Sequence, residues 1–222
     1  MASIDQESQS DTFLSTEGDA WFYRNENQLS KDRQLDIDFL SKTLISRKSE
    51  IRNILEIGCA GGHKLAALAH IFGATGYGID PSKAAIQSAR KSAKLSDSKL
   101  NFVTGLATDL PYPDAKFDLV FFGFCLYLVP PKEIFKAVME ADRVLKSGGY
   151  LAIVDFDYGQ LKVNPYKHAD GVYSFKNNYS QFFTSSGYFH LVSKWSFSHL
   201  GNSFETDKDE RLAIEVLFKE FN

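Results

Sequence analysis

Short apolar runs alternate with amphipathic stretches between residues 53 and 155, and this alternation restricts the fold more than any other feature. The runs expected to be strands are Asn53–Ile57, Thr75–Ile79, Leu100–Thr104, Phe117–Phe122 and Tyr150–Asp155. Helices are expected over Lys64–Phe72, from Pro81 to about Lys94, and over Lys132–Leu145, the last closed by the glycines of Lys146–Gly149. Strands and helices in strict alternation indicate a parallel sheet covered by helices on both faces.

The pattern changes after Asp157. Residues 158–179 are aromatic and polar and too long for an ordinary connection, which predicts a lid or binding loop. A short helix over Gln181–Ser186 and strands near Tyr188–Ser196 and Arg211–Lys219 complete the prediction. We therefore expect an α/β, doubly wound, mostly parallel seven-stranded sheet with an antiparallel last strand. The expected divisions are a flexible tail over 1–12 and one domain over 13–222, made of N-terminal helices (13–49), a core (50–156), a loop (157–180) and a final helix and strands (181–222).

Composition excludes several classes of protein. The 222 residues carry a net charge of −3 and no dense run of Lys or Arg, which argues against a nucleic-acid partner. No apolar run approaches the roughly 18 residues of a membrane span, and the N-terminus does not read as a signal peptide. Cys59 and Cys125 lack ligand-like spacing, so neither a metal site nor a disulfide is expected, and the location predicted is cytoplasmic.

The segment Glu56–Gly62 joins the first strand to the first helix with small residues, which let a ligand approach the backbone. A dinucleotide fingerprint would need glycine at positions 58, 60 and 63, but Ala60 and His63 stand at two of them. An NAD-dependent oxidoreductase is therefore a disfavoured alternative, and an ordinary α/β turn is another. Asp80 ends the second strand, where its carboxylate can accept both hydroxyls of a ribose.

Four segments, in order, resemble the motifs of class I S-adenosylmethionine-dependent methyltransferases of the type 11 or type 25 kind. They are the acid and glycine turn of Glu56–Gly62, the run Gly105–Tyr112, Phe117–Val120 leading to Gly123, and Arg143–Gly149. The resemblance covers about residues 50–156. Ala60 replaces the middle glycine of the first motif, and Leu106 stands where family members often carry an Asp that binds adenine.

The resemblance implies S-adenosylmethionine as cofactor, S-adenosylhomocysteine as product and no metal. The residues expected at the cofactor are Glu56, Gly58, Cys59, Ala60, Gly62, Asp80, Pro81, Leu106, Ala107, Phe122, Gly123 and Arg24. Arg24 is expected to pair with the cofactor's carboxylate, although a surface arginine beside Trp21 is an alternative.

The acceptor side is predicted in the long loop. His168 is a candidate general base or a solvent-exposed loop residue, and Tyr127 is a second candidate near the transferred methyl. Tyr166, Tyr173, Lys176 and Tyr179 suit a polar ring such as a sugar, or form an aromatic cluster that pins the loop. The expected activity is O- or N-methylation of a small polar molecule, with sugar or glycan precursors as one class. A cofactor-binding protein without turnover is the alternative, and a homodimer is compatible with the sequence.

Overall fold

The computed structural model describes residues 8–29, 35–95, 99–198, 201 and 203–221. Its helices are α1 (Gln9–Thr12), the π-helix η1 (Phe13–Glu17), α2 (Gly18–Leu29), α3 (Leu35–Leu44), the 3₁₀ turn η2 (Ile45–Arg47), α4 (His63–Phe72), α5 (Lys83–Leu95), the 3₁₀ turn η3 (Leu126–Leu128), α6 (Ile134–Val144) and α7 (Gln181–Thr184). Its strands are β1 (Asn53–Ile57), β2 (Thr75–Asp80), β3 (Leu100–Thr104), β4 (Phe117–Gly123), β5 (Leu145–Phe156), β6 (Lys162–Pro165), β7 (Tyr173–Lys176), β8 (Phe189–Ser198) and β9 (Arg211–Lys219).

Seven strands form one sheet in the order β3-β2-β1-β4-β5-β9-β8. The pairs from β3 to β5 are parallel, and β9 runs antiparallel to both β5 and β8. The order reverses between β1 and β4, and loops at such a switch point form ligand sites at the carboxyl ends of the strands. The predicted α/β sheet, with its antiparallel last strand, is confirmed.

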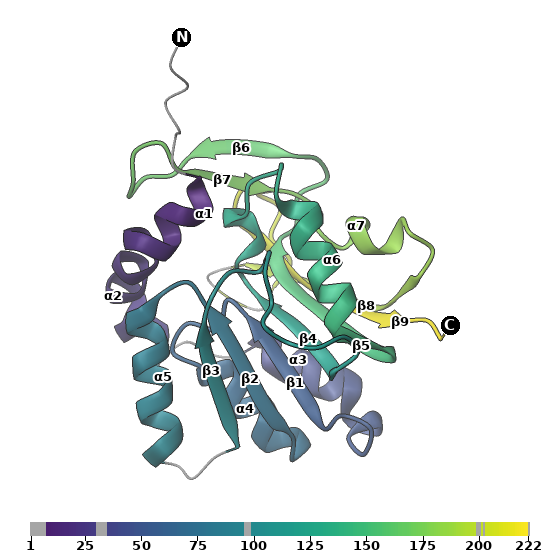
Figure 1. Ribbon diagram of the computed structural model, residues 1–222. Coiled ribbons are helices and arrows are strands. Elements are labelled where there is room, and N and C mark those ends of the chain that lie inside the picture. Colours follow the sequence, from purple (N-terminus) through teal and green to yellow (C-terminus); the bar gives the residue numbers. More distant parts are fainter. Residues whose placement is uncertain (1–7, 30–34, 96–98, 199–200, 202, 222) are drawn as a thin grey trace.

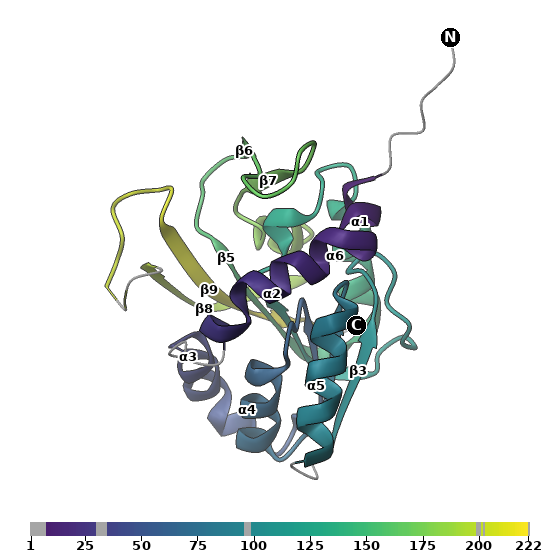
Figure 2. The ribbon, with the colours of Figure 1, turned by 90° about the vertical axis from the view of Figure 1, so that its left-hand side faces the viewer.

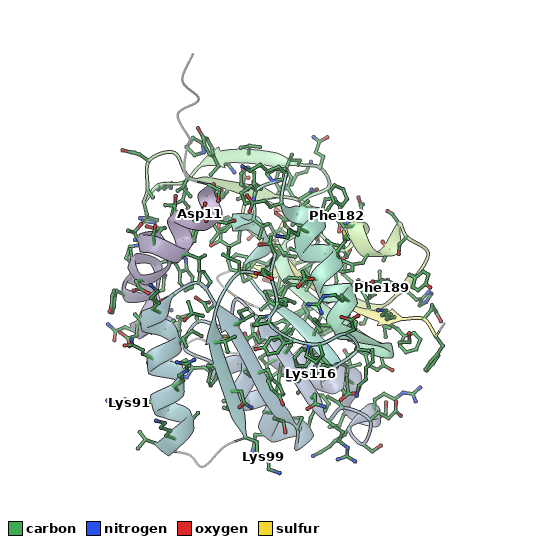
Figure 3. The ribbon with its side chains drawn as sticks, viewed as in Figure 1. Asp11, Lys91, Lys99, Lys116, Phe182 and Phe189 are labelled. Carbon is green, nitrogen blue, oxygen red and sulfur yellow. The ribbon has the colours of Figure 1, made fainter. Side chains whose placement is uncertain are left out.

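Helices cover both faces of the sheet, and Figure 2 shows α4 and α5 on one of them. The face covered by α4 and α5 is packed with apolar side chains such as Leu40, Leu65 and Ile86. Ile134 and Phe183 belong to the apolar cluster on the opposite face. The apolar positions of α5 recur at helical spacing, so its buried stripe packs on the sheet while residues such as Lys91 remain outside (Figure 3).

Three segments differ from the sequence prediction. Residues 8–12 were expected in a flexible tail, but α1 begins there with a reciprocal capping box between Ser8 and Asp11. The glycines near 148 do not close a helix: α6 ends at Val144, and Gly148, with a φ of +77°, lies in the irregular start of β5. The long loop contains an antiparallel hairpin, β6–β7, which lies beside α1 in Figure 1. Residues 1–7 of the predicted tail lie outside the described residues.

The described helices include none that is long and apolar enough to cross a membrane. Within the same ranges, no three His, Cys, Asp or Glu side chains are grouped as ligands for a metal ion.

Candidate functional site

The glycine turn after β1 is held by backbone contacts. The N–H groups of Gly58 and Cys59 both donate to the carbonyl oxygen of Ile79 on β2, at 2.9 and 3.1 Å. Gly58 has a φ of +75°, and a Cβ there would lie 2.6 Å from the Cβ of Cys125. Ala60 takes a φ of +43°, a conformation that costs a non-glycine residue about 1–2 kcal/mol. The turn is therefore fixed in one strained shape, as at many ligand sites.

Asp80 at the end of β2 is fastened to the same turn. Its Oδ2 accepts the Ala60 N–H at 2.8 Å, and its Oδ1 accepts the Ser82 N–H at 2.9 Å. Burial raises the pKa of this carboxyl to about 6, against the effect of the two N–H donors. Each carboxylate oxygen has a second lone pair for a ligand hydroxyl. Ribose binding by Asp80 remains a prediction that this geometry permits.

Glu56 is the least exposed acid of the site, at 2%, and its Oε2 has no hydrogen-bond partner among the described residues. Burial raises the pKa of this carboxyl to about 8, although the nearby charge of Lys64 lowers it. Gly123 of β4 leaves room for the other oxygen, because a Cβ there would lie 2.7 Å from Oε1. A buried acid oxygen without a partner is costly unless a ligand supplies one. A cationic group beside the turn would meet that need.

The N-terminal helices from α1 to α2, residues 8–29, form a roof over this edge of the sheet (Figure 2). A Cβ at Gly18 would lie 3.1 Å from the Ser82 nitrogen, so α2 rests directly on the loop after Asp80. Asp19 accepts hydrogen bonds from the Ser82 hydroxyl at 2.7 Å and the Ala84 N–H at 2.9 Å. The ring of the buried Phe22 lies 3.7 Å from the Cβ position of Gly61. Sequence reasoning missed Asp19, which has no local motif around it.

An aromatic cluster follows β4 and β5. Phe124, Tyr127 and Phe156 have ring centroids 4.8 to 5.4 Å apart. Phe124 has a φ of +63°, a second strained non-glycine residue at this edge of the sheet. Tyr127 is buried, and burial raises the pKa of its hydroxyl above its usual range. Its place beside the strand ends agrees with a role near the acceptor, which stays a prediction.

Asp155 fixes the turn that carries Tyr127. Its Oδ2 accepts the Tyr127 N–H at 3.1 Å, and its Oδ1 accepts the Phe156 N–H at 2.8 Å. The carboxyl is buried, and this burial raises its pKa to about 7. The sequence analysis did not select Asp155, although its position at the end of a buried strand, like that of Asp80, was a usable signal.

Arg24 has partners within the protein. Its guanidinium forms an ion pair with the buried Glu17 and donates a hydrogen bond to the Tyr166 hydroxyl at 3.2 Å. These contacts join the roof to the β6–β7 hairpin, and the expected pairing of Arg24 with a cofactor carboxylate stays a prediction. Phe13 adds to the same junction, with its ring 6.3 Å from that of Tyr166.

The predicted acceptor residues are separated by the structure. His168 is exposed in the hairpin turn, and its ring meets that of Tyr166 edge-on with the centroids 5.4 Å apart, as for a solvated loop histidine. Lys176 donates to the Asp209 carbonyl oxygen at 2.5 Å and lies 4.1 Å from the centre of the Phe156 ring. Tyr173 is exposed, and its backbone bonds to Gln9 of the roof. Tyr179 is buried, and its hydroxyl donates to the Phe175 carbonyl oxygen, so this hydroxyl does not face an open site.

The other residues predicted at the cofactor differ in how deeply they are buried. Leu106 and Ala107 are half-buried directly after β3, and Pro81 lies under Gly18. Cys59 is buried, with its sulfur 2.7 Å from the Cβ position of Gly78. The side chain of Phe122 is wholly buried, with its ring centroid 6.4 Å from that of Phe183, so only its backbone is left to contact a cofactor, and its role there stays a prediction.

Comparison with known proteins agrees with this geometry. Residues 55–153 match the family model described as a methyltransferase domain. The matched residues run from β1 into β5 and make up a little under half of the chain.

The chain is similar over about half of its length to curated methyltransferases. Over 104 residues, 47% of each chain, it is 36% identical to an uncharacterized methyltransferase of Synechocystis sp.. A fatty-acid O-methyltransferase of Mycolicibacterium smegmatis is 33% identical over 120 residues, which are 54% of this chain and 42% of that protein. The chain thus spans less than half the length of these two curated relatives.

The fold is shared over a greater length than the sequence. The 1,6-didemethyltoxoflavin-N1-methyltransferase of Burkholderia thailandensis, solved with bound 1,6-didemethyltoxoflavin and S-adenosylhomocysteine, superposes with a TM-score of 0.74 at 14% identity. The superposition covers all of this chain and 93% of that one. The roof and the hairpin lie outside the part of the chain that matches the methyltransferase domain model.

Proposed function

We propose that the protein is an S-adenosylmethionine-dependent methyltransferase that acts on a small-molecule acceptor. One observation supports the cofactor most: the buried Oε2 of Glu56 lacks a partner beside the strained glycine turn. The methionine end of S-adenosylmethionine carries an ammonium group, which is the kind of partner that this oxygen lacks. Asp80 would hold the ribose, and Leu106 and Ala107 would pack beside the adenine.

The bound cofactor would supply an activated methyl group on a sulfonium, so the protein's task is to align the acceptor and exclude water. Three features of this chain serve that task. The turn fixes one end of the cofactor site, α2 covers it, and the aromatic cluster lies at the neighbouring strand ends. A hydroxyl acceptor would also need a base, and Asp155 offers a buried carboxyl with a pKa raised to about 7. Its oxygens bind backbone N–H groups, so we assign it a positioning role for Tyr127.

The finer expectation of a sugar or glycan acceptor has little support. The polar ends of Lys176, Tyr179 and Tyr166 are occupied within the protein. The named relatives act on a fatty acid and a toxoflavin precursor. A small acceptor with substantial apolar surface agrees better with the aromatic cluster, and the transfer would go to oxygen or nitrogen.

The test is calorimetric titration with S-adenosylhomocysteine, followed by a screen of acceptors with radiolabelled S-adenosylmethionine. Asp80→Ala should weaken cofactor binding at least tenfold, because it removes the ribose acceptor and the tether of Ala60. Asp38→Asn, an exposed acid on α3, is the matched control and should bind like the wild type. Unchanged affinity in Asp80→Ala would remove the ribose assignment. Binding without transfer to any acceptor would favour a cofactor-binding protein without turnover.

A further inference from the structure

The loop over residues 105–116 joins β3 to β4 and contains Leu106 and Ala107, which the proposed function places beside the adenine. The first residue of the loop is fixed from the cofactor side, because the Gly105 N–H donates to the carbonyl oxygen of Asp80 at 3.0 Å. The rest of the loop follows no helix or strand. Its shape therefore depends on contacts with the elements behind it.

Arg143, near the end of α6, holds this loop by its backbone. Its Nε and Nη2 donate to the two carboxylate oxygens of Glu140, both at 2.8 Å. Nη2 also donates to the carbonyl oxygen of Leu110 at 3.0 Å, and Nη1 donates to that of Tyr112 at 2.8 Å. Nη1 makes a fifth hydrogen bond with Asp114 at 2.8 Å. A guanidinium group has five N–H groups, so this one is held in a single orientation.

Glu140 holds the same part of the loop. Its Oε2 accepts the Leu110 N–H at 2.7 Å, so the N–H and the carbonyl group of Leu110 are both bound by one ion pair. Glu140 and Arg143 are three residues apart on α6, and their side chains are 18% and 32% exposed. Hydrogen bonds to charged groups are about twice as strong as those between neutral groups. We call this pair the Glu140–Arg143 clamp.

The end of the loop is fixed as well. The N–H groups of Ala115 and Lys116 donate to the carbonyl oxygens of Arg143 and Val144, both at 2.9 Å. The ammonium group of Lys116 lies 3.8 Å from the centre of the Tyr77 ring on β2, a cation–π contact. Residues 106–109 thus span the distance between a fixed start and a clamped end.

This span is where the proposed function places the base of the cofactor. The side chain of Leu106 has no polar atom, so at this position only backbone groups can hydrogen-bond the base. Adenine presents a donor at its 6-amino group and an acceptor at N1, whereas hypoxanthine presents the reverse. A backbone held in one place distinguishes the two bases, because the wrong one leaves polar groups without partners. A mobile backbone adapts to either.

We propose that Glu140 and Arg143 are positioning residues for adenine recognition, and that they set the base selectivity of the cofactor site through the loop. The inference rests on the proposed function for the position of the adenine. The clamp itself is a contact between α6 and the loop that needs no ligand.

The test is calorimetric titration with S-adenosylhomocysteine and with S-inosylhomocysteine, which carries hypoxanthine in place of adenine. The wild type should prefer the adenine ligand by about tenfold or more. Glu140→Ala should weaken binding of S-adenosylhomocysteine by about tenfold and reduce the preference to less than about threefold. Arg143→Lys should act in the same direction, because a lysine cannot form the fork. Glu140→Gln keeps an oxygen for the Leu110 N–H and should retain most of the preference.

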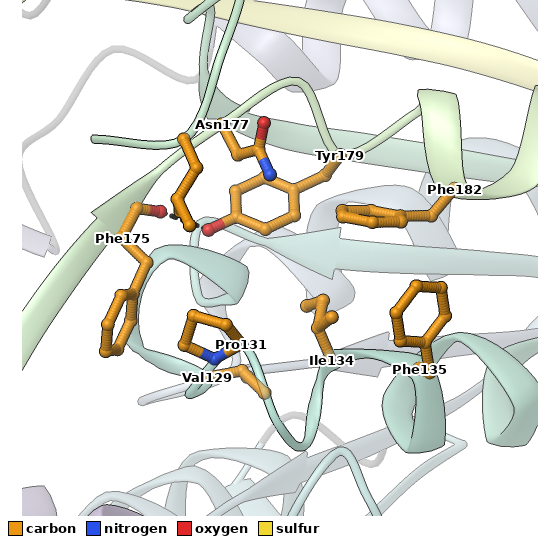
Figure 4. Close-up of a pocket in the computed structure, with 9 residues that line it drawn as sticks. Val129, Pro131, Ile134, Phe135, Phe175, Asn177, Tyr179 and Phe182 are labelled. Carbon is orange, nitrogen blue, oxygen red and sulfur yellow. Dashed lines mark hydrogen bonds between the residues drawn. The ribbon is translucent and has the colours of Figure 1, made fainter. Parts of the chain in front are cut away.

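Three control variants leave the clamped backbone alone. Lys219→Met removes a buried ammonium that donates to the carbonyl oxygens of Asp142 and Leu145 at 2.7 and 3.1 Å, so it also disturbs the end of α6. Asp114→Ala removes the acceptor of Arg143 whose side chain is 79% exposed. Phe135→Ala changes the start of α6, where Figure 4 shows Phe135 beside Phe182. All three should keep the affinity and the preference within about twofold of the wild type.

Hydrogen exchange tests the clamp without any ligand. Glu140→Ala should speed exchange of the N–H groups of residues 105–112, whereas Lys219→Met should not. Unchanged exchange there would overturn the proposal. So would a Glu140→Ala variant that loses affinity but keeps the wild-type preference, or a Lys219→Met variant that loses as much preference as Glu140→Ala.

The same titrations separate this proposal from the proposed function. A wild type that binds neither ligand would contradict the methyltransferase proposal, and the role of the clamp in adenine recognition would fail with it. A wild type that binds S-adenosylhomocysteine, with the same base preference in every variant, would contradict the role of the clamp alone.

Discussion

The glycine turn is held through its own backbone N–H groups, whereas the roof is joined to the hairpin through side-chain groups of the roof. Gly58 and Ala60 are held through their N–H groups by Ile79 and Asp80. The roof is joined to the hairpin by the side chains of Gln9 and Arg24. Backbone contacts tolerate sequence change around them, so a common cofactor can be kept. Side-chain contacts change with single substitutions, which suits the part of the molecule that selects an acceptor.

The largest loss of folding stability is expected from a substitution in the glycine turn. Gly58→Ala should destabilise the fold by about 3 kcal/mol, because a left-handed backbone and a Cβ 2.6 Å from Cys125 are both unfavourable. Gly73→Ala is the control: its φ is +67°, but no atom lies within 4 Å of its Cβ position, so about 1 kcal/mol is expected. Urea unfolding measures both. Equal losses would show that the turn is not tightly packed.

Glu56 should make the stability of the cofactor-free protein depend on pH. Its pKa is raised from 4.5 to about 8 in the folded protein, so the folded state binds this proton more tightly than the unfolded chain. Stability should therefore be complete near pH 4.5 and fall as pH rises to about 8. Glu56→Gln, which cannot ionise, should melt about 5 °C above the wild type at pH 8 and close to it at pH 5. The same difference in melting temperature between the two proteins at pH 5 and pH 8 would contradict the raised pKa of Glu56.

Loss of a contact between the roof and the hairpin should loosen the hairpin without unfolding the protein. The Gln9 side chain donates to the carbonyl oxygens of Leu128 and Tyr173 and accepts the Tyr173 N–H at 2.9 Å. Gln9→Ala should cost less than about 1 kcal/mol of global stability but raise hydrogen exchange across β6 and β7. Thr16→Ala, an exposed change in the same helical segment, should leave exchange unchanged. Unchanged hydrogen exchange across β6 and β7 in Gln9→Ala would show that the hairpin does not depend on its contact with the roof.

The smallest effect, a minor change in turnover, is expected from substitution of His168. The side chain is exposed and touches Tyr166 at a ring edge, so His168→Ala should lower turnover less than threefold with any acceptor that the screen finds. Tyr127→Phe, at the buried cluster, should lower it more. A hundredfold loss in His168→Ala, with an altered pH profile, would restore the histidine as the base.

The cofactor edge was predictable from sequence because its signals are local. Strands Leu100–Thr104 and Arg211–Lys219 were predicted to the residue, and the turn at Gly58 was found from its small side chains. The roof was not predictable in this way. Gln9 meets Tyr173 across 164 positions, and Asp19 meets Ser82 across 63. Such contacts depend on how distant segments pack, so no short sequence pattern predicts them. The contacts of Arg24 with Glu17 and Tyr166 were missed for the same reason.

The most direct test of the account is whether Glu56 loses its proton when the cofactor binds. Near pH 7 the free acid is mostly protonated, since its pKa is about 8, and an ammonium placed beside it would lower that pKa. Calorimetry with S-adenosylhomocysteine in two buffers of different ionisation enthalpy counts the protons released. We predict a net release by the wild type that Glu56→Gln abolishes. No binding by the wild type, or the same proton release by both proteins, would contradict the cofactor site described above.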